Sequence, residues 1–440
     1  MKSKISRRDF LGRSGKAAAG VGLGLIGGKL LAADAPTAQE AKPIPPSEKI
    51  IVGVIGCGGM GMNNMNSFMK QPDVEIAAVC DVYEPHLNRA LEKTGGKATP
   101  YKDFRKLLER KDIDAVIVAT PDHWHAIPTI YACQAGKDVY VEKPVAHNIK
   151  EGRAMARAAR GYKRVVQVGT QQRSAKHFER AVNIVKSGKI GKVTLARCWN
   201  VSNNFPKGIG NQPDCDPPAD LDWSMWLGPA PMRQYNPNRC IYDFRWFWDY
   251  AGGKVTDWGV HLIDIVHWAM AVDAPLAVAA SGGKYGIEDN TETPDTIEAI
   301  FDYPGFTMVY FHTNCNAKGM DGKDYGIQFY GTNGTLFVDR SGFQIYPEGE
   351  RMKDVDVELE ASRQKGSEAH ARNFLDCVKS RGIPVSDIEI GHRSSSAPML
   401  ANIALRTGRK IHWDGKRERI IGDKEAGKLL TRTYRKPWSI

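Results

Sequence analysis

Two side chains four residues apart form the clearest candidate for proton-transfer chemistry. If the chain is helical from about Thr256, Asp257 and His261 lie on one face, with Asp264 one turn further along. A carboxylate in this position can orient an imidazole and stabilise its charged form, so His261 could accept the proton of a hydroxyl group. Taken alone, a histidine on an amphipathic helix is more often a structural residue, and this alternative stays open.

A lysine lies where a sheet of parallel strands would place ligand-binding residues. Lys143 belongs to Glu142-Lys143-Pro144, directly after a short apolar run. In open parallel sheets, ligands bind beyond the carboxyl ends of the strands, and Lys143 could there bind and polarise an oxygen atom. Residues 120–125 follow another apolar run in the same way. Within them, His123 and His125 could contact a ligand or be purely structural, and both alternatives stay open.

A glycine-rich turn has the features of a dinucleotide site. The run 50–55 predicts a buried strand and leads into Gly56-Cys57-Gly58-Gly59-Met60-Gly61, followed by a helix over about 60–70. Glycine at these places permits a tight turn, close approach of the backbone to a pyrophosphate, and close packing of helix on strand. A second strand ends at Asp81, where a carboxylate can accept both ribose hydroxyls of NAD and would repel the additional phosphate of NADP. We therefore expect NAD, with NADP the weaker alternative.

Strands and helices alternate through the first part of the chain. Six strands are expected in order, as in a doubly wound α/β fold with a parallel sheet. The pattern delimits five of them, at 50–55, 74–80, 114–120, 138–141 and 165–168, and the helices are about 60–70, 104–110, 127–135 and 151–160.

The pattern changes at about residue 170. A helix over 177–187 is followed by longer strands, which include 296–302, 306–313, 327–330 and 335–338. The last two are joined through Asn333-Gly334, a hairpin signal. This predicts an α+β domain with a large, mostly antiparallel, open-faced sheet. Seven of the ten tryptophans fall between Trp199 and Trp268, and whether they stack on sugar rings or form a core or a subunit interface stays open.

The formal net charge of +11 is concentrated at the two ends of the chain. Residues 1–35 hold seven Lys and Arg against two acidic residues, and residues 401–440 hold eleven against four, so the segment between them is close to neutral. A near-neutral body argues against nucleic acid as a partner. We expect residues 416–440 to form a basic, solvated and partly helical tail.

The N-terminal segment is organised like an export signal. Arg7-Arg8 precede a weakly apolar run over 17–28 and a stretch of small residues that ends near residue 35. Twelve apolar residues are too few to span a bilayer as a helix, and no later apolar run reaches about 18 residues. The segment resembles a twin-arginine signal, which implies export of the folded protein to the periplasm without stable membrane anchoring.

These features define an expected domain organisation. It consists of a signal peptide (1–35), a Pro-rich linker (36–47), a Rossmann NAD(P)-binding domain (48–170), a substrate-binding and oligomerisation domain (171–415) and the basic tail (416–440).

The eight cysteines show neither Cys-x-x-Cys pairs nor the spacing of a zinc ribbon. We expect buried free thiols, although a disulfide between Cys215 and Cys240 stays open in an exported protein. Two acidic and histidine groups, one around His123 and one around His261, could be drawn as metal sites, but we expect no metal.

The motifs together resemble the Gfo/Idh/MocA superfamily of glucose-fructose oxidoreductase, inositol dehydrogenase and rhizopine catabolism proteins. The resemblance extends over most of residues 48–415 and rests on the glycine turn, Thr120-Pro121, Glu142-Lys143-Pro144 and Asp257-x-x-x-His261. It implies that Lys143, Asp257 and His261 surround the reacting carbon and the nicotinamide. It also implies a metal-free reaction and a homodimer or homotetramer.

The site residues expected on these grounds fall into three groups. The catalytic residues are Lys143, Asp257 and His261. The cofactor contacts are Gly56, Gly58, Gly59, Met60, Gly61, Asp81, Thr120, Pro121, His125, Glu142 and Lys143. The substrate contacts are Lys143, Arg173, Asp257 and His261, with Gln171 a weaker candidate.

Export limits the reaction, because little free dinucleotide is available outside the cytoplasm. The cofactor would have to stay bound and be reoxidised in place. We expect an oxidoreductase that transfers hydride between a sugar hydroxyl and a tightly bound nicotinamide. The alternative is an NAD-dependent glycoside hydrolase working by transient oxidation, elimination, hydration and reduction. A second alternative is a nucleotide and sugar sensor without turnover. The expected partners are a small carbohydrate and the twin-arginine export machinery.

Overall fold

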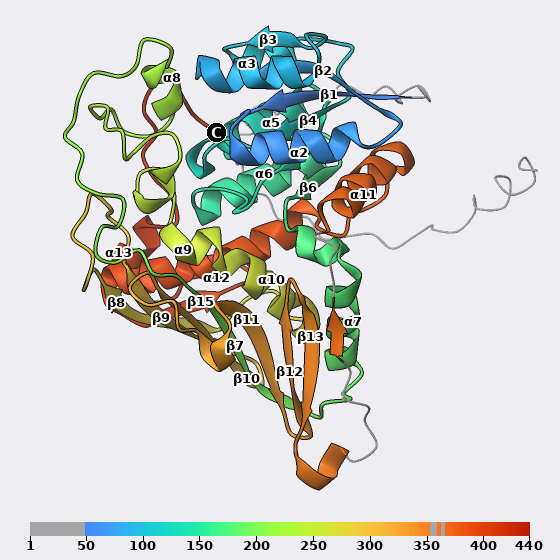
Figure 1. The fold of residues 1–440 in the computed structure, drawn as a ribbon, viewed down its shortest axis with the longest axis vertical. Coiled ribbons are helices and arrows are strands. Elements are labelled where there is room, and N and C mark those ends of the chain that lie inside the picture. Colours follow the sequence, from blue (N-terminus) through green and yellow to red (C-terminus); the bar gives the residue numbers. More distant parts are fainter. Residues whose placement is uncertain (1–48, 353–358, 362–365) are drawn as a thin grey trace, which may run out of the picture. The chain divides into compact units, whose positions relative to one another are not determined.

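The computed structural model of the chain describes residues 49–352, 359–361 and 366–440, which contain two β-sheets (Figure 1). The predicted signal peptide (1–35) and linker (36–47) lie outside the described residues.

The first sheet has six parallel strands in the order β3-β2-β1-β4-β5-β6, the doubly wound topology that the alternating pattern predicts. Strands β4 and β5 are buried along their whole length, which explains their continuous apolar sequence. The elements are β1 (Ile50–Ile55), α2 (Gly59–Met69), β2 (Val74–Cys80), α3 (Glu84–Lys93), β3 (Thr99–Tyr101), α4 (Phe104–Leu108), β4 (Ala115–Val118), α5 (Ala126–Gln134), β5 (Asp138–Val141), α6 (Ile149–Gly161) and β6 (Val166–Val168).

The second sheet has ten strands in the order β14-β13-β12-β11-β7-β10-β9-β8-β15-β16. All neighbours are antiparallel except β7 and β10, so the predicted α+β domain is confirmed. Its strands are β7 (Val193–Val201), β8 (Ala277–Gly283), β9 (Thr296–Tyr303), β10 (Phe306–Thr313), β11 (Tyr325–Gly331), β12 (Gly334–Asp339), β13 (Gly342–Pro347), β14 (Leu359–Ala361), β15 (Ile411–Asp414) and β16 (Arg419–Ile420).

Helices cover one face of this second sheet. They are α7 (Lys176–Lys186), α10 (Gly259–Met270) and α12 (Ile388–Thr407), whose buried side chains share one core with the strands (Figure 1). On β9, alternate positions such as Glu298 and Ile300 are exposed, so the other face is open in the single chain. The remaining helices of this half are α8 (Trp223–Leu227), α9 (Gly253–Asp257), α11 (Ser367–Ser380) and α13 (Lys424–Lys428).

The sequence boundary near residue 170 does not separate the two cores. Helix α11 returns from the second half of the chain and packs beside α2 (Figure 1). Its Phe374 and Leu375 are fully buried in the core that contains β1. Residues distant in sequence thus complete the apolar surface of the Rossmann domain.

The C-terminal segment 416–440 is partly helical, as predicted, because it contains α13, but the prediction of a solvated tail is wrong for its last residues. Trp438 is 8% exposed and packs between the Rossmann residues Phe104 and Trp124. Arg432 donates to the buried carboxylate of Glu151 at 2.8 Å, and Arg435 donates to the carbonyl oxygen of Gly228. These two arginines therefore bind buried acceptors, which a count of charges along the sequence does not reveal.

The cysteines are free thiols, six of them buried. Cys215 is exposed whereas Cys240 is buried, so the disulfide considered between them does not form. Within the described residues, we find no helix both long and apolar enough to cross a membrane.

We predict that Trp438→Ala lowers the free energy of unfolding by about 3 kcal/mol, because it removes a large ring from a packed core. Denaturant unfolding measures the change. The neighbouring exposed residue provides a control: Ser439→Ala should change the stability by less than about 0.5 kcal/mol. Equal stability of both variants would mean that the tail is solvated.

Candidate active site

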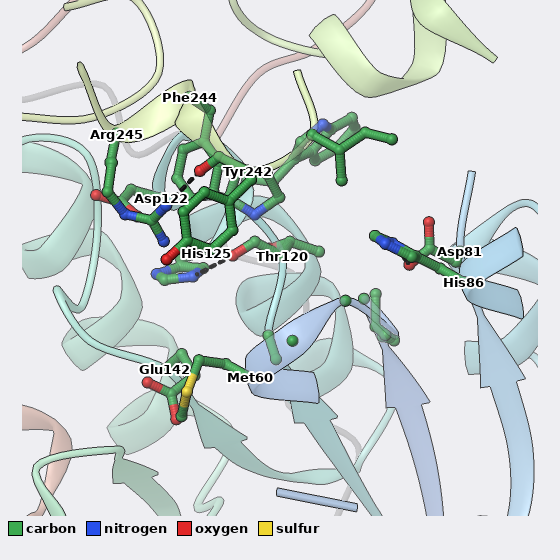
Figure 2. Close-up of a pocket in the computed structure, with 18 of the residues that line it drawn as sticks. Met60, Asp81, His86, Thr120, Asp122, His125, Glu142, Tyr242, Phe244 and Arg245 are labelled. Atoms are coloured by element: carbon green, nitrogen blue, oxygen red, sulfur yellow. Dashed lines mark hydrogen bonds and ion pairs between the residues drawn. The ribbon is translucent and has the colours of Figure 1, made fainter. Parts of the chain in front are cut away.

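A cavity of about 660 Å³ lies at the carboxyl ends of the parallel strands and is lined by both halves of the chain. Asp81 and His86 lie at one end, whereas Asp122, Tyr242 and Arg245 lie at the other (Figure 2). The volume suits a ligand of cofactor size together with a small substrate. The location is the one that open parallel sheets use for ligands.

The glycine turn after β1 has room for nothing larger than glycine at two of its places. Gly56 has φ +87°, and a Cβ there would lie 2.7 Å from the carbonyl oxygen of Ala119. A Cβ on Gly61 would lie 1.9 Å from the carbonyl oxygen of Gly56, so Gly61 serves the close packing of α2 rather than the cavity wall. Gly58, Gly59 and Met60 line the cavity.

The start of α2 fits a phosphate-binding role. No side chain caps this end of the helix, which leaves backbone N–H groups beside the cavity for an anion. The turn and the helix therefore fit the pyrophosphate of a dinucleotide.

Asp81 is held rigidly at the end of β2. Its Oδ2 accepts from the backbone N–H of Cys57 at 2.7 Å, and its Oδ1 accepts from that of Tyr83 at 2.9 Å. Both bonds fix the carboxylate at the cavity wall, where its remaining lone pairs can accept ribose hydroxyls. This placement agrees with the expected choice of NAD over NADP.

The predicted strand-end residues also line the cavity: Thr120, Pro121, His125, Glu142 and Lys143. The ring nitrogens of His125 lie 2.7 Å from the carbonyl oxygen of Pro144 and 2.8 Å from that of Thr120. Burial lowers the pKa of His125 to about 4, so the ring is neutral and donates to only one of them. Glu142 accepts from the amide of Asn64 at 2.8 Å, and burial raises its pKa.

An ion pair joins the Rossmann domain to the second half at the centre of the site. Lys143 Nζ donates to Oδ1 of Asp257 at 2.8 Å and to its carbonyl oxygen at 2.9 Å. Arg245 lies 3.7 Å from the other carboxylate oxygen. Burial acts to raise the pKa of Asp257, but the charges of Lys143 and Arg245 outweigh it and hold this pKa well below the usual range.

The helix that carries Asp257 and His261 differs from the prediction. Helix α9 ends at Asp257 and α10 begins at Gly259, with Trp258 between them. Asp257 turns its carboxylate to Lys143, and Nδ1 of His261 has no hydrogen-bond partner among the described residues. The expectation that Asp257 orients the imidazole of His261 is therefore wrong, because a stronger cationic partner is within reach.

His261 is nevertheless suited to accept a proton. Burial and the positive charges of Lys143 and Arg340 lower the pKa of His261 well below its ordinary value. The ring is therefore neutral at physiological pH, which is the form a general base requires.

Two predicted residues lie elsewhere. Arg173, expected as a substrate contact, does not line the cavity: its guanidinium is buried and pairs with Asp264 at 2.8 Å. His123 is fully buried, and its Nε2 lies 3.0 Å from the carbonyl oxygen of Trp226. Both placements indicate structural roles. Gln171, the weaker candidate, does line the cavity.

Asp122, Arg245 and Arg340 also line the cavity, and they are not among the binding residues expected from the sequence. Asp122 faces the region of Arg245 (Figure 2), and burial raises its pKa to about 7. Arg245 belongs to a short 3-10 helix (Asp243–Trp246) and packs on the rings of Tyr242 and Phe244. Arg340 comes from the turn after β12. The sequence could have indicated Asp122 as a ligand contact, because it follows the end of a strand. No nearby motif indicates such a role for Arg245 or Arg340.

Comparison with known proteins assigns the chain to a family. Residues 50–170 match the NAD-binding Rossmann fold of the oxidoreductase family named Gfo/Idh/MocA, and residues 181–440 match its C-terminal alpha/beta domain. The chain belongs to the Gfo/Idh/MocA oxidoreductase family. The match of the second domain reaches residue 440, which agrees with the packed C-terminal segment.

Individual members of the Gfo/Idh/MocA family are more distant. A Shewanella baltica protein named glycosyl hydrolase family 109 protein is 34% identical over 161 residues, covering 33% of this chain and 35% of that protein. The inositol 2-dehydrogenase of Salmonella paratyphi B is 32% identical over 154 residues, covering 34% of this chain and 46% of that protein. The chain thus matches less than half the length of either relative.

A solved structure shows the same fold over most of the chain. Levoglucosan dehydrogenase, in complex with NADH and levoglucosan, has a TM-score of 0.65 and 17% sequence identity. The match covers 83% of this chain and 99% of that chain. At this identity the likeness concerns the fold.

We predict that the protein binds NADH at least about tenfold more tightly than NADPH, because the Asp81 carboxylate repels a ribose phosphate. Asp81→Asn should narrow this ratio by about tenfold, since it removes the charge and keeps the shape. Titration of the protein freed of nucleotide measures both affinities. Asp112→Asn, which removes an exposed carboxylate of the same domain, should leave the ratio unchanged. Equal affinity of the unaltered protein for both nucleotides would contradict the assignment.

Proposed function

We propose that this protein is an NAD-dependent oxidoreductase that oxidises a hydroxyl group of a sugar or sugar derivative. One observation carries the proposal: Lys143, Asp257 and the neutral His261 line the same cavity as the glycine turn and Asp81. The family supports the class of reaction, and relatives named as inositol and levoglucosan dehydrogenases support a polyhydroxylated substrate.

The charged groups divide the work of removing a proton from a hydroxyl group. Lys143 uses two hydrogen bonds on Asp257, which leaves one N–H to donate to the reacting oxygen. A neutral ring nitrogen of His261 accepts the hydroxyl proton as the carbon becomes a carbonyl. A bound nicotinamide would supply the ability to accept a hydride from that carbon and to return it. Asp257 keeps Lys143 in place through these two hydrogen bonds.

A glycoside hydrolase is the second candidate, and Asp122 favours it. With a pKa of about 7, its carboxyl is protonated in a large fraction of molecules at neutral pH and could donate a proton to a leaving oxygen. The similarity to proteins named glycosyl hydrolase family 109 points the same way over a third of the chain. In this reaction Lys143 and His261 would act twice, in oxidation and in reduction, without net redox change.

We further propose that the protein is exported through the twin-arginine route to the periplasm with its nucleotide bound. The Arg7-Arg8 pair and the apolar run 17–28 support this proposal. Retention of the cofactor would follow, because the compartment offers no pool with which to exchange it. The exposed face of the second sheet supports assembly into a homodimer or homotetramer.

The first test is to purify the protein without added nucleotide and to identify the bound molecule by mass spectrometry. Sugars and glycosides are then added, and the absorbance of NADH at about 340 nm is followed. We expect retained NAD(H) whose reduced band appears with a sugar and disappears with a second carbonyl substrate. Glycoside cleavage without lasting reduction would instead favour the hydrolase. A protein that binds no dinucleotide would contradict both.

We predict that His261→Asn lowers the turnover rate by about 10²- to 10⁴-fold, because it removes the proton acceptor. The affinity for NADH should change less than about twofold. A matched control is His412→Asn, which alters an exposed histidine on β15 and should leave turnover unchanged. Equal turnover of the two variants would mean that His261 is not the base. If neither the variants nor the unaltered protein turned over, the alternative of a nucleotide and sugar sensor would be favoured.

A further inference from the structure

Positive charge exceeds negative charge at the substrate end of the cavity. Lys143, Arg245 and Arg340 all line it. Asp257 is the one carboxylate there whose pKa is held low, and it is shared by Lys143 at 2.8 Å and Arg245 at 3.7 Å. Asp122, with a pKa of about 7, is ionised in only part of the molecules. Lys143 and Arg245 share Asp257, which leaves the third cation without an ion pair among the described residues.

That cation is Arg340. Its guanidinium carbon lies 4.7 Å from the ring centre of Trp258, and the side chain lines the cavity. Among the residues that the structure describes, no carboxylate forms an ion pair with it. The positive charge of Arg340 lowers the pKa of His261. The negative charge of Asp257 in turn acts to raise the pKa of Arg340. Burial lowers the pKa of Arg340, but a guanidinium stays charged at neutral pH.

A cation in this environment is suited to bind an anion supplied by a ligand. Removing a guanidinium from water is unfavourable unless hydrogen bonds and an opposite charge replace the water. The contact with the Trp258 ring holds the guanidinium at the cavity wall, where its N–H groups can donate to a ligand. A carboxylate matches this fork of donors through two parallel hydrogen bonds.

We propose that the substrate is an acidic sugar, a uronic acid or uronate glycoside, whose carboxylate is bound by Arg340. This inference rests on the proposed function and adds the chemical class of the substrate. Arg340 and His261 line the same cavity, so we expect the bound carboxylate to lie on the sugar that carries the reacting hydroxyl. A monoanion supplies the one carboxylate that Arg340 can pair with. A neutral sugar would leave Arg340 desolvated and unpaired, which gives discrimination against it.

The test measures binding rather than turnover, with the NADH-loaded full chain. Glucuronate, galacturonate and mannuronate are titrated calorimetrically, each beside the neutral hexose of the same configuration. We expect at least one uronate to bind tenfold or more tightly than its neutral counterpart, with an affinity that falls as salt is added. Arg340→Gln should abolish this preference while the affinity for the neutral hexose changes less than about twofold. Arg157→Gln, which removes an exposed arginine of α6, should preserve it.

The outcomes separate this inference from the proposed function. Equal binding of uronates and neutral hexoses, or an equal loss of both in Arg340→Gln, would overturn the inference and leave the oxidoreductase in place. Preferential binding of glucose 6-phosphate over every uronate would also overturn it, because the anion recognised would then be a phosphate. If the protein bound none of these sugars, the result would contradict the proposed function, because the proposed substrate is a sugar.

Discussion

The ion pair between Lys143 and Asp257 is the interaction on which the site depends. Lys143 stands after a strand of the parallel sheet, and Asp257 ends a helix of the second half, so one contact brings the nucleotide and substrate portions into a single cavity. The Lys143 and Asp257 side chains are only 12% and 21% exposed. A largely buried pair of this kind is strongly unfavourable to break, because either partner alone would keep an uncompensated charge. The relative placement of the reacting groups is thereby fixed.

The same pair determines the protonation of its neighbours. Because Asp257 is committed to Lys143 and Arg245, its charge does little to stabilise an imidazolium, and His261 remains neutral. Asp122, buried beside the same charges, is poised near neutral pH. Two carboxylates and a histidine that line one cavity thus acquire different roles from their environments. The arrangement offers one fixed cation, one base and one acid around a space for a hydroxylated ligand.

Local pattern predicts the parts of this structure whose cause is local. The glycine turn, the strand ends and Asp81 are where the sequence places them, since backbone geometry at a strand, turn and helix admits few alternatives. Asp257 pairs with Lys143, which is 114 positions away along the chain, and not with His261, which is four positions away. A local pattern does not predict this contact. Likewise, the pairing of Arg173 with Asp264 and the burial of Trp438 follow from tertiary packing. Arg340 can be identified as a candidate ligand contact only from the fold, which brings it to the ring of Trp258.

The most direct measurement of the central claim is an NMR titration of His261 in protein labelled at histidine, with His261→Gln to assign the resonance. At about pH 6 an ordinary histidine is largely protonated. The account predicts that His261 is neutral there, and that Lys143→Met raises its pKa by removing a neighbouring positive charge. An imidazolium at neutral pH, or a pKa that does not respond to Lys143→Met, would contradict the account.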